Sequence, residues 1–585
     1  MFVDDIVKGF YDIISKNKIL ILVNYDVDAI CAVKILQCIL RFDNIIYILV
    51  PVKTLTELKR EYDEQKADVK HVILINCGGT SDIVEILQPE DNVIFFIVDS
   101  HRPTDVCNIY SSSQIRILAP PEDDEKIPEF EYIFNEDESS EEETFSDYPK
   151  DDDDDDDDAS IEEQQNKRRK LDQSVLLRRK EIRKWEENRK KLLFDYSQFS
   201  YYGRSSAMLM FDLAWKLHRE SIDLLWWGIV GVTEQYILGK TERMRYLKEV
   251  EVIGGHIGRI CESTLNHENK ENISKSSVTK PINFSAQLRI ESDKDLLLAL
   301  YRHWTIESSL RYSMFTAVSL KLWTIKGEKR LQQILAEMGL PLSESRQMFY
   351  SMDLSLRKQF YGMMEKISNA HNLLQMTYPS FMLLQGFKTK YQCADYVYSM
   401  VATLETNTCE ISTIKCFYNT LDSLSRSKKD LLDQGIEKAK WILTNMFRHV
   451  QAALDMKQIV SAGPFYYFIV QEGTLHSQHY SNPHCLTMLA TFALRAQVAS
   501  VRKAKATRLP LIASATLNSS EETCLVAGIP PITETMPKSF FGKAFEQAAN
   551  KTNIELTLDY FDSSIAKLKI RDRPRFFDAL SALLS

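Results

Sequence analysis

The first 120 residues predict an α/β fold with a parallel sheet that is covered by helices on both faces. Strand-like apolar segments alternate there with segments of helical spacing. Because these strands are apolar along their whole length, they fit a sheet that is buried on both sides. The predicted strands are residues 18–26, 45–52, 71–77, 92–100 and 114–119, and the helices between the first three are residues 29–40 and 55–66.

The chain is long enough for several domains. It has 585 residues, of which 44% are hydrophobic and 10% aromatic, so roughly three or four domains of ordinary size can form. We expect a first part of the α/β domain (1–119), an acidic disordered loop (120–166), a basic protruding helix with the remainder of that domain (167–260), a polar loop (261–285), an inserted all-α partner-docking domain (286–400), linker helices (401–456) and a C-terminal α/β domain (457–585).

Cysteine usage and hydropathy indicate a soluble protein of a reducing compartment. The ten cysteines form no CxxC pair and no group with zinc-ligand spacing, which fits buried, reduced thiols. The N-terminal MFVDDIVKGF places two acids where a secretory signal is basic and then apolar. No apolar run reaches the ~18 residues that span a bilayer. We therefore expect no membrane partner.

The net charge of −10 is concentrated in one segment. Residues 136–163 carry 17 acids, including the eight aspartates of 151–158, and one lysine, so the rest of the chain is mildly basic. This acidic stretch has too few apolar residues to offset its chain entropy, and we expect it to be disordered. Residues 167–191 carry 12 basic and 4 acidic residues. Within them Lys167, Arg168, Arg169 and Lys170 resemble a nuclear import signal, although a solvated helix start has the same composition.

Polar side chains follow the apolar strands at the edge where a parallel sheet forms its sites. Asp26 and Asp28 follow the first strand, Asn76 the third, and Asp99 and His101 the fourth. Carboxylates and imidazole that converge at this edge can hold divalent cations for phosphoester hydrolysis. Acids at such turns also cap helices, so both interpretations remain open.

The order and spacing of these residues resembles the DHH phosphoesterase superfamily, which includes the RecJ exonucleases. That resemblance implies a DxDG turn, an acid after the third strand, a DHH triplet and a late Asp, which together hold two Mn²⁺ or Mg²⁺ ions. This chain departs from the pattern at five positions, which are Asn24, Ala29, Asn76, Ser100 and Glu234.

Each departure at a ligand position weakens metal binding. Asn76 is neutral where the family has a carboxylate, and Ser100 is a poor ligand compared with imidazole. Glu234 stands where the late Asp is expected. We therefore predict that the set Asp26, Asp28, Asn76, Asp99, His101 and Glu234 holds no metal, that the chain has no catalytic residues, and that it needs no cofactor.

Longer motifs show a closer resemblance to the eukaryotic cell division control protein 45 family. They cover nearly the whole chain and include NYDVDAICAVKIL, ILINCGG, FFIVDSHRP, YYGRSSAMLMFDLAW, LLWWGIVGVTEQY, LKLWTIKGEKRLQQILAEMGLPL, GFKTKYQCADYVY, LDSLSRS and FFGKAFEQAA.

This resemblance implies an inactive RecJ-like DHH domain, an inserted helical domain and a terminal DHHA1-like domain. It implies assembly with the MCM hexamer and GINS into the replicative helicase, contact with the polymerase and initiation factors, and a nuclear, chromatin-bound location at origins and forks. The ATPase then lies in partners, because this chain has no GxxxxGK[ST] loop. The alternative is an active Mn²⁺-dependent exonuclease of single-stranded DNA.

A basic cluster near the C-terminal end could contact single-stranded DNA. No acid interrupts it, and phosphate contacts need clustered guanidinium and ammonium groups. A solvated helix end explains the same residues. The cluster comprises Arg495, Arg502, Lys503, Lys505 and Arg508.

Overall fold

The computed structural model contains two compact units, Met1–Pro121 with Ser200–Ser585, and Glu122–Phe199. The predicted import signal, residues 167–170, lies outside the described residues. The described ranges are 1–122, 125–134, 180–273, 288–371, 373, 375–385, 389–406, 412–474, 476–501, 504–518, 520–532 and 537–585.

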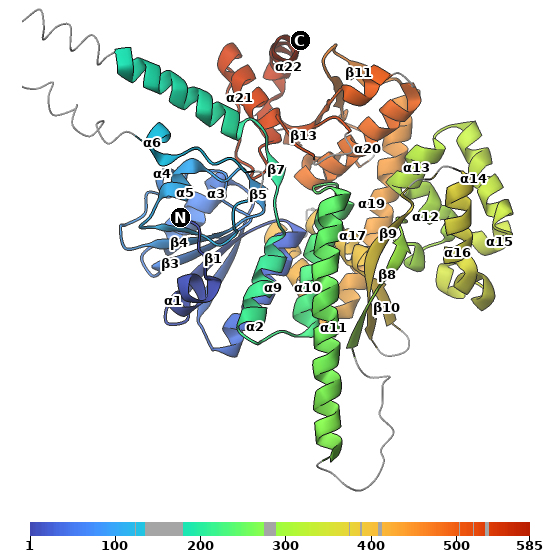
Figure 1. Cartoon of the computed structure of the whole chain (residues 1–585). Helices are drawn as coiled ribbons and strands as arrows, with labels where there is room; N and C mark the ends of the chain where they lie inside the picture. The colour runs from blue at the N-terminus through green and yellow to red at the C-terminus, as the bar shows by residue number, and fades with distance from the viewer. Residues whose placement is uncertain are drawn as a thin grey trace, which may run out of the picture. The chain divides into compact units, whose positions relative to one another are not determined.

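The first unit begins with the predicted parallel sheet (Figure 1), and the α/β fold class is confirmed. The strand order is β2-β1-β3-β4-β6, with all neighbours parallel. The first strand pairs with both β2 and β3, which places it inside the sheet. The strands are β1 (Ile19–Asn24), β2 (Tyr47–Val52), β3 (His71–Ile75), β4 (Ile94–Val98) and β6 (Ile115–Ile117).

Helices cover this sheet because its strands are apolar on both faces. Ile19, Ile21 and Val23 point into a core that they share with α2, α9 and α10. Several turns between strand and helix are closed by side-chain caps, for example Thr54, which accepts a hydrogen bond from the Glu57 N–H. The helices around this sheet are α1 (Asp12–Ile14), α2 (Val27–Phe42), α3 (Leu55–Gln65), α4 (Ile83–Leu87), α5 (Val106–Tyr110), α9 (Ser206–Lys216) and α10 (Ile222–Ile237).

A short antiparallel ladder returns the chain to this sheet. It pairs β5 (His101–Arg102) with β7 (Tyr201–Tyr202). His101 lies opposite Tyr202, so the segment before α9 passes beside the carboxyl end of β4. This ladder brings residues after position 200 next to the strand ends of the first 100.

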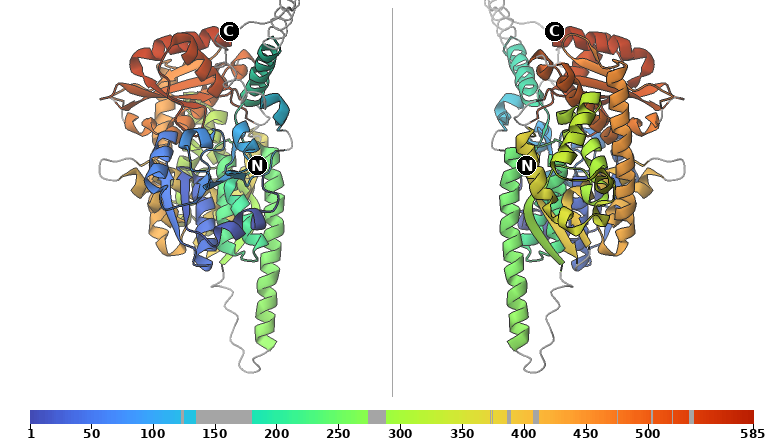
Figure 2. Two further views of the ribbon diagram at one scale, coloured as in Figure 1. Left: turned by 90° about the vertical axis from the view of Figure 1, so that its left-hand side faces the viewer. Right: turned by 90° about the vertical axis from the view of Figure 1, so that its right-hand side faces the viewer.

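Helix α11 (Arg243–Ile273) corrects the predicted polar loop of residues 261–285. The helix continues through residues 261–273, so the loop prediction is wrong there, and residues 274–285 lie outside the described chain. Figure 2 shows α11 as one continuous helix. The polar composition of residues 261–273 concealed this helix, because hydropathy does not distinguish a polar helix from a loop.

We expected the inserted segment, residues 286–400, to be all-α, and this prediction is wrong. It contains an antiparallel sheet in the order β10-β9-β8. Strand β8, with the sequence LRIESDKDL, is mostly polar, so neither alternation nor an apolar run indicated a strand there. The elements are β8 (Leu288–Leu296), α12 (Ile306–Tyr312), α13 (Met314–Leu320), α14 (Ile325–Glu337), α15 (Leu342–Ser345), α16 (Leu354–Ala370), β9 (Thr377–Gln385), β10 (Thr389–Gln392) and α17 (Cys393–Leu404).

Two linker helices and a second mixed sheet complete the first unit. The sheet order is β11-β12-β13-β14-β15, and only β12 and β13 pair in parallel. The elements are α18 (Thr413–Ser423), α19 (Lys429–Asp455), β11 (Val460–Ser461), β12 (Tyr466–Ile469), α20 (Pro483–Val501), β13 (Leu511–Asn518), β14 (Thr523–Ile529), α21 (Phe541–Thr552), β15 (Ile565–Lys569) and α22 (Arg573–Leu584).

The second unit contains α6 (Phe130–Ile133) and a helix over residues 180–197. Tyr196 donates a hydrogen bond of 2.9 Å to Glu125, which joins the two parts of this unit. Its basic helix is largely exposed, as the sequence predicts. Within the described ranges, every helix of the chain is too short or too polar to span a bilayer.

Candidate functional site: a degenerate metal pocket

The predicted pocket forms at the carboxyl ends of β1, β3 and β4. Asp26, Asp28, Asn76, Asp99 and His101 all lie there, and each is at most 7% exposed. The structure therefore brings together the residues that the sequence places after these strands. The order of neighbours β1, β3 and β4 in the sheet is the reason.

Asp26 acts first as a helix cap. Its side chain accepts a hydrogen bond of 2.6 Å from the Ala29 N–H at the start of α2. Asn24 donates to the other carboxylate oxygen of Asp26 at 3.3 Å. Asp26 therefore performs the capping role that the sequence left open, while its carboxylate also faces the pocket.

The amide of Asn76 lies between the two leading carboxylates. Its Nδ2 donates to Asp26 Oδ2 at 3.0 Å and to Asp28 Oδ2 at 3.3 Å. Its Oδ1 accepts hydrogen bonds from the Ser100 N–H at 3.1 Å and from Ser206 Oγ at 2.5 Å. The donors at Oδ1 determine which end of the amide faces the acids. The N–H groups of Asn76 therefore point where a cation would need lone pairs.

Asp28 accepts hydrogen bonds mainly from the start of helix α9. Its carboxylate accepts from Ser205 Oγ at 2.5 Å, from the Ser206 N–H at 2.8 Å and from the Ala207 N–H at 3.0 Å. With the bond from Asn76, it has four donors, which is about the full capacity of a carboxylate. Burial, then the charge of Asp26, raises the pKa of Asp28, and these donors oppose the rise. Asp28 is in effect an anion bound at a helix N-terminus.

Asp99 and His101 form a buried pair beside these two acids. His101 Nδ1 lies 2.7 Å from Asp99 Oδ1, and the Gly79 N–H donates to Asp99 Oδ2 at 2.8 Å. Burial alone would raise the pKa of Asp99, but the charge and hydrogen bonds of His101 outweigh it and lower that pKa. Burial likewise opposes the charged form of His101, whose pKa is nevertheless raised by Asp99. The histidine is therefore held by an acid of its own site.

Gly79 is required for this arrangement. A Cβ atom at Gly79 would lie 2.7 Å from Asp99 Oδ2, which is closer than real Cβ contacts. Only glycine allows the backbone N–H to approach the carboxylate this closely.

Glu234 is fully buried on α10 and is paired with a lysine. Lys240 Nζ lies 2.7 Å from Glu234 Oε1 and 4.8 Å from the ring centroid of Tyr202. Burial raises the pKa of Glu234, and Lys240 opposes this rise. Burial opposes the charged form of Lys240, but the charges of Glu234 and Asp26 outweigh it and raise the pKa of Lys240 well above its usual value. The chain thus supplies its own cation next to the pocket.

The donor set does not fit a pair of divalent ions. Both leading acids accept hydrogen bonds from an amide, Asp28 has no lone pair to spare, and His101 faces Asp99. Of the residues that the structure describes, the one group of three ligand side chains with atoms within 4.8 Å of one another is Asp82, Asp105 and Cys107. Two of these cap short helices, and none belongs to the pocket.

Several residues of the pocket were not predicted from the sequence. They are Gly79, Tyr202, Ser205, Ser206 and Lys240. A pair of serines directly before an apolar helical stretch is a helix-start signal that could have indicated Ser205 and Ser206. No local pattern indicates Lys240, because its partner Glu234 is buried by other elements.

The predicted basic cluster is not assembled as one surface in the described part of the chain. Arg495 is half-buried on α20, and its guanidinium faces the turn at Gly239, while Arg508 is exposed. Arg502 and Lys503 lie outside the described residues, as does the side chain of Lys505. DNA contact by this cluster therefore stays a prediction.

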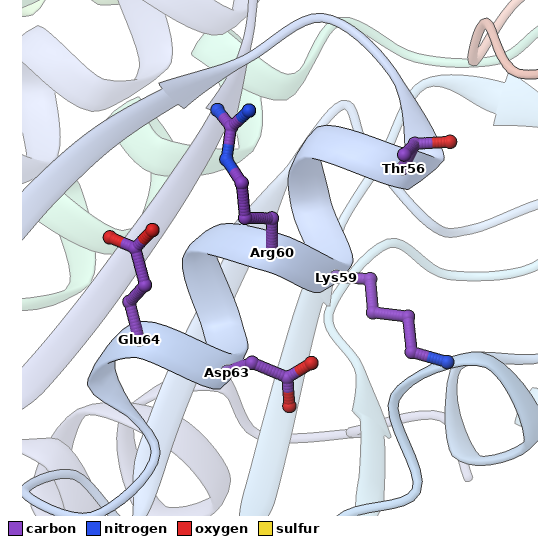
Figure 3. A pocket seen from close by; sticks show the side chains of 5 residues that line it. All are labelled: Thr56, Lys59, Arg60, Asp63 and Glu64. Atoms are coloured by element: carbon purple, nitrogen blue, oxygen red, sulfur yellow. The ribbon is translucent and has the colours of Figure 1, made fainter.

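A surface depression on α3 contains none of the pocket residues described above. Figure 3 shows its side chains on the outer face of that helix, with both signs of charge. It is lined by Thr56, Lys59, Arg60, Asp63 and Glu64. Exposed mixed charges of this kind give little binding energy, so we assign no function to it.

Comparisons with known proteins identify the family of the chain. The CDC45 family matches residues 19–583. The human cell division control protein 45 homolog is 38% identical, and the alignment covers 100% of both chains. The crystal structure of CDC45 from Entamoeba histolytica aligns with a TM-score of 0.67 at 21% identity, again over 100% of both chains. A RecJ exonuclease bound to manganese aligns at a TM-score of 0.40 and 10% identity, over 97% of this chain and 90% of RecJ. The chain therefore belongs to the CDC45 family of DNA-replication proteins.

Proposed function

We propose that this protein is a non-catalytic structural subunit of the replicative DNA helicase, and that it bridges the MCM ring and GINS during initiation and elongation. It acts in the nucleus, on chromatin at origins and forks, where the polymerase and initiation factors are further partners. Family membership supports the role in replication. The segment Lys167–Lys170 is the proposed import signal.

One observation supports the absence of catalysis. The Asn76 amide donates to Asp26 and Asp28 at 3.0 and 3.3 Å, in the place where a phosphoesterase needs a bridging carboxylate. A metal ion requires lone pairs from every neighbour, and an N–H group offers none. The carboxylates are already stabilised by hydrogen bonds, so little is gained when an ion replaces those donors.

The alternative of a manganese-dependent exonuclease makes a direct prediction. Purified protein is expected to leave labelled single-stranded DNA intact when Mn²⁺ is added, because the pocket cannot position two ions. The measurement is product length on a denaturing gel, and the control is the Asp26→Ala, Asp28→Ala double variant. Degradation by the unmodified chain that disappears in this variant would show an active enzyme.

The architectural role predicts a loss of unwinding when the protein is removed. Depletion from a replication-competent nuclear extract is expected to abolish DNA unwinding while MCM proteins remain on chromatin, and add-back of the purified chain restores it. The folded Asp26→Ala, Asp28→Ala variant is added back in a parallel reaction, and it is expected to restore unwinding as well. Unwinding that persists after depletion contradicts the proposal.

Contact with single-stranded DNA is a secondary part of the proposal. Arg508 is exposed and lies in the same stretch as the other predicted basic residues. Phosphate contacts of this kind weaken steeply as salt rises. Binding of an oligonucleotide is expected to fall when Arg502 and Lys503 are neutralised together and to become less dependent on salt.

A further inference from the structure

Two arginines that are distant in sequence approach the same turn of the chain. Arg243 is the first residue of α11, and Arg495 lies on α20. The turn at Gly239 separates α10 from α11, and a Cβ atom at Gly239 would lie 3.8 Å from Arg495 Nη2. Figure 1 shows the start of α11 near α20. The guanidinium of Arg495 therefore lies against this turn.

Among the described residues, neither guanidinium has an acidic partner. Arg243 Nη2 donates to the Thr377 carbonyl at 3.4 Å, while its Nη1 is buried and no described residue accepts a hydrogen bond from it. Within the described ranges Arg495 makes no hydrogen bond or ion pair, although it is half-buried. Burial lowers the pKa of Arg495. A buried cation without a counter-charge costs free energy, and a bound anion would recover it.

Tyr236 supplies a third donor near the two arginines, whose charges both act on it. Its ring stacks on Tyr246 at 4.3 Å between centroids and lies 5.6 Å from Tyr378, so it is held in a fixed orientation. Burial raises the pKa of Tyr236, and the charges of Arg243 and Arg495 oppose the rise. The hydroxyl therefore stays protonated at neutral pH and can donate a hydrogen bond.

The region around Arg243 and Arg495 keeps its positive charge. Lys240 is paired with the buried Glu234, so that acid is not available to the arginines. Planar guanidinium groups bind oxyanions through parallel hydrogen bonds, and two of them balance two negative charges.

We propose that Arg243, Arg495 and Tyr236 form a binding site for a phosphate dianion, at the junction of α10, α11 and α20. The ligand is inorganic phosphate or a terminal phosphate monoester. The free Nη1 of Arg243, the unpaired guanidinium of Arg495 and the Tyr236 hydroxyl are its donors. This site does not depend on the degenerate metal pocket or on the proposed helicase role.

The test is thermal unfolding of the full chain at pH 8, with chloride replaced by phosphate at constant ionic strength. The midpoint is expected to rise and to saturate, because a ligand that binds only the folded state stabilises it. Dimethyl phosphate, a monoanionic diester, is expected to give a smaller rise. An equal rise with the diester would overturn the dianion assignment, and no rise with phosphate would overturn the site.

Variants locate the effect. Tyr236→Phe removes one hydroxyl and is expected to weaken phosphate binding roughly tenfold, as one hydrogen bond to a charged group does. Arg495→Lys keeps the charge but loses the planar fork, and it is expected to weaken binding further. Arg571→Gln removes an arginine whose side chain is 77% exposed, and it should leave the phosphate effect unchanged. If Tyr236→Phe and Arg495→Lys both keep the full effect, phosphate binds elsewhere and the proposal fails.

A crystal soak provides a readout that does not depend on variant stability. Selenate resembles a doubly charged phosphate, and its anomalous signal is expected between Arg243 and Arg495. Selenate peaks at other positions alone would exclude this site.

Discussion

Replacement of Asn76 with aspartate is expected to lower the free energy of unfolding by about 4 kcal/mol at pH 7. The new carboxyl would lie among two buried carboxylates, where a third charge cannot be accommodated, so it must be protonated on folding. Protonation of an ordinary aspartate at pH 7 costs about this amount, since each pKa unit is ~1.4 kcal/mol.

The pH dependence of this loss has a definite sign. The folded-state pKa of the new carboxyl is raised above its unfolded value, so the folded variant is favoured at low pH and destabilised as pH rises. The difference from the wild type should therefore shrink toward pH 4, near the unfolded pKa. Denaturant unfolding at pH 4 to 8 measures this difference.

Added Mn²⁺ is expected to recover part of the stability of Asn76→Asp. The substitution creates a third carboxylate and removes the amide donor from Asp26 and Asp28, which are the two changes that a hard cation needs. Asn445→Asp is the matched control, because it buries a new carboxyl at a site that is 8% exposed on α19. An equal response of both variants to Mn²⁺ would show that the pocket has no special affinity.

Replacement of Lys240 with methionine is expected to cost roughly 3 kcal/mol at pH 7. Glu234 is fully buried and would lose the cation at 2.7 Å, so it must be protonated in the folded state. Protonation of an ordinary glutamate at pH 7 costs about 3 to 4 kcal/mol. Loss of one partner from a buried ion pair has a similar cost.

The stability lost in Lys240→Met is expected to grow as pH rises. Burial already raises the pKa of Glu234, and removal of Lys240 raises it further. The variant should therefore approach the wild type near pH 4.5 and diverge as pH rises. The double variant Lys240→Met, Glu234→Gln is expected to recover most of the loss, because no charge remains buried.

Lys440→Met is the matched control for this experiment. Lys440 is also largely buried, but its partner Glu437 has a side chain that is 71% exposed. Glu437 can be solvated when the lysine is removed, so a smaller loss without pH dependence is expected. If Lys240→Met and Lys440→Met lose stability equally at all pH values, Lys240 does not stabilise the charged form of Glu234.

The positions of the pocket acids followed from the sequence because they depend on local order. Apolar runs that end in Asp26, Asn76 and Asp99 specify strands and the residues after them, and parallel strands end at one edge. The same local patterns failed for β8 and for residues 261–273, where the polar composition concealed a strand and a helix.

How the pocket acids are satisfied was decided only by tertiary structure. Asp28 and Ser206 are separated by 178 positions in the chain, yet the Ser206 N–H binds that carboxylate. The Lys240 cation reaches Glu234 because α10 is buried and the following turn folds back on it. Residue order identifies the acids, but their charge state depends on burial and on donors from distant segments, and packing alone brings these together.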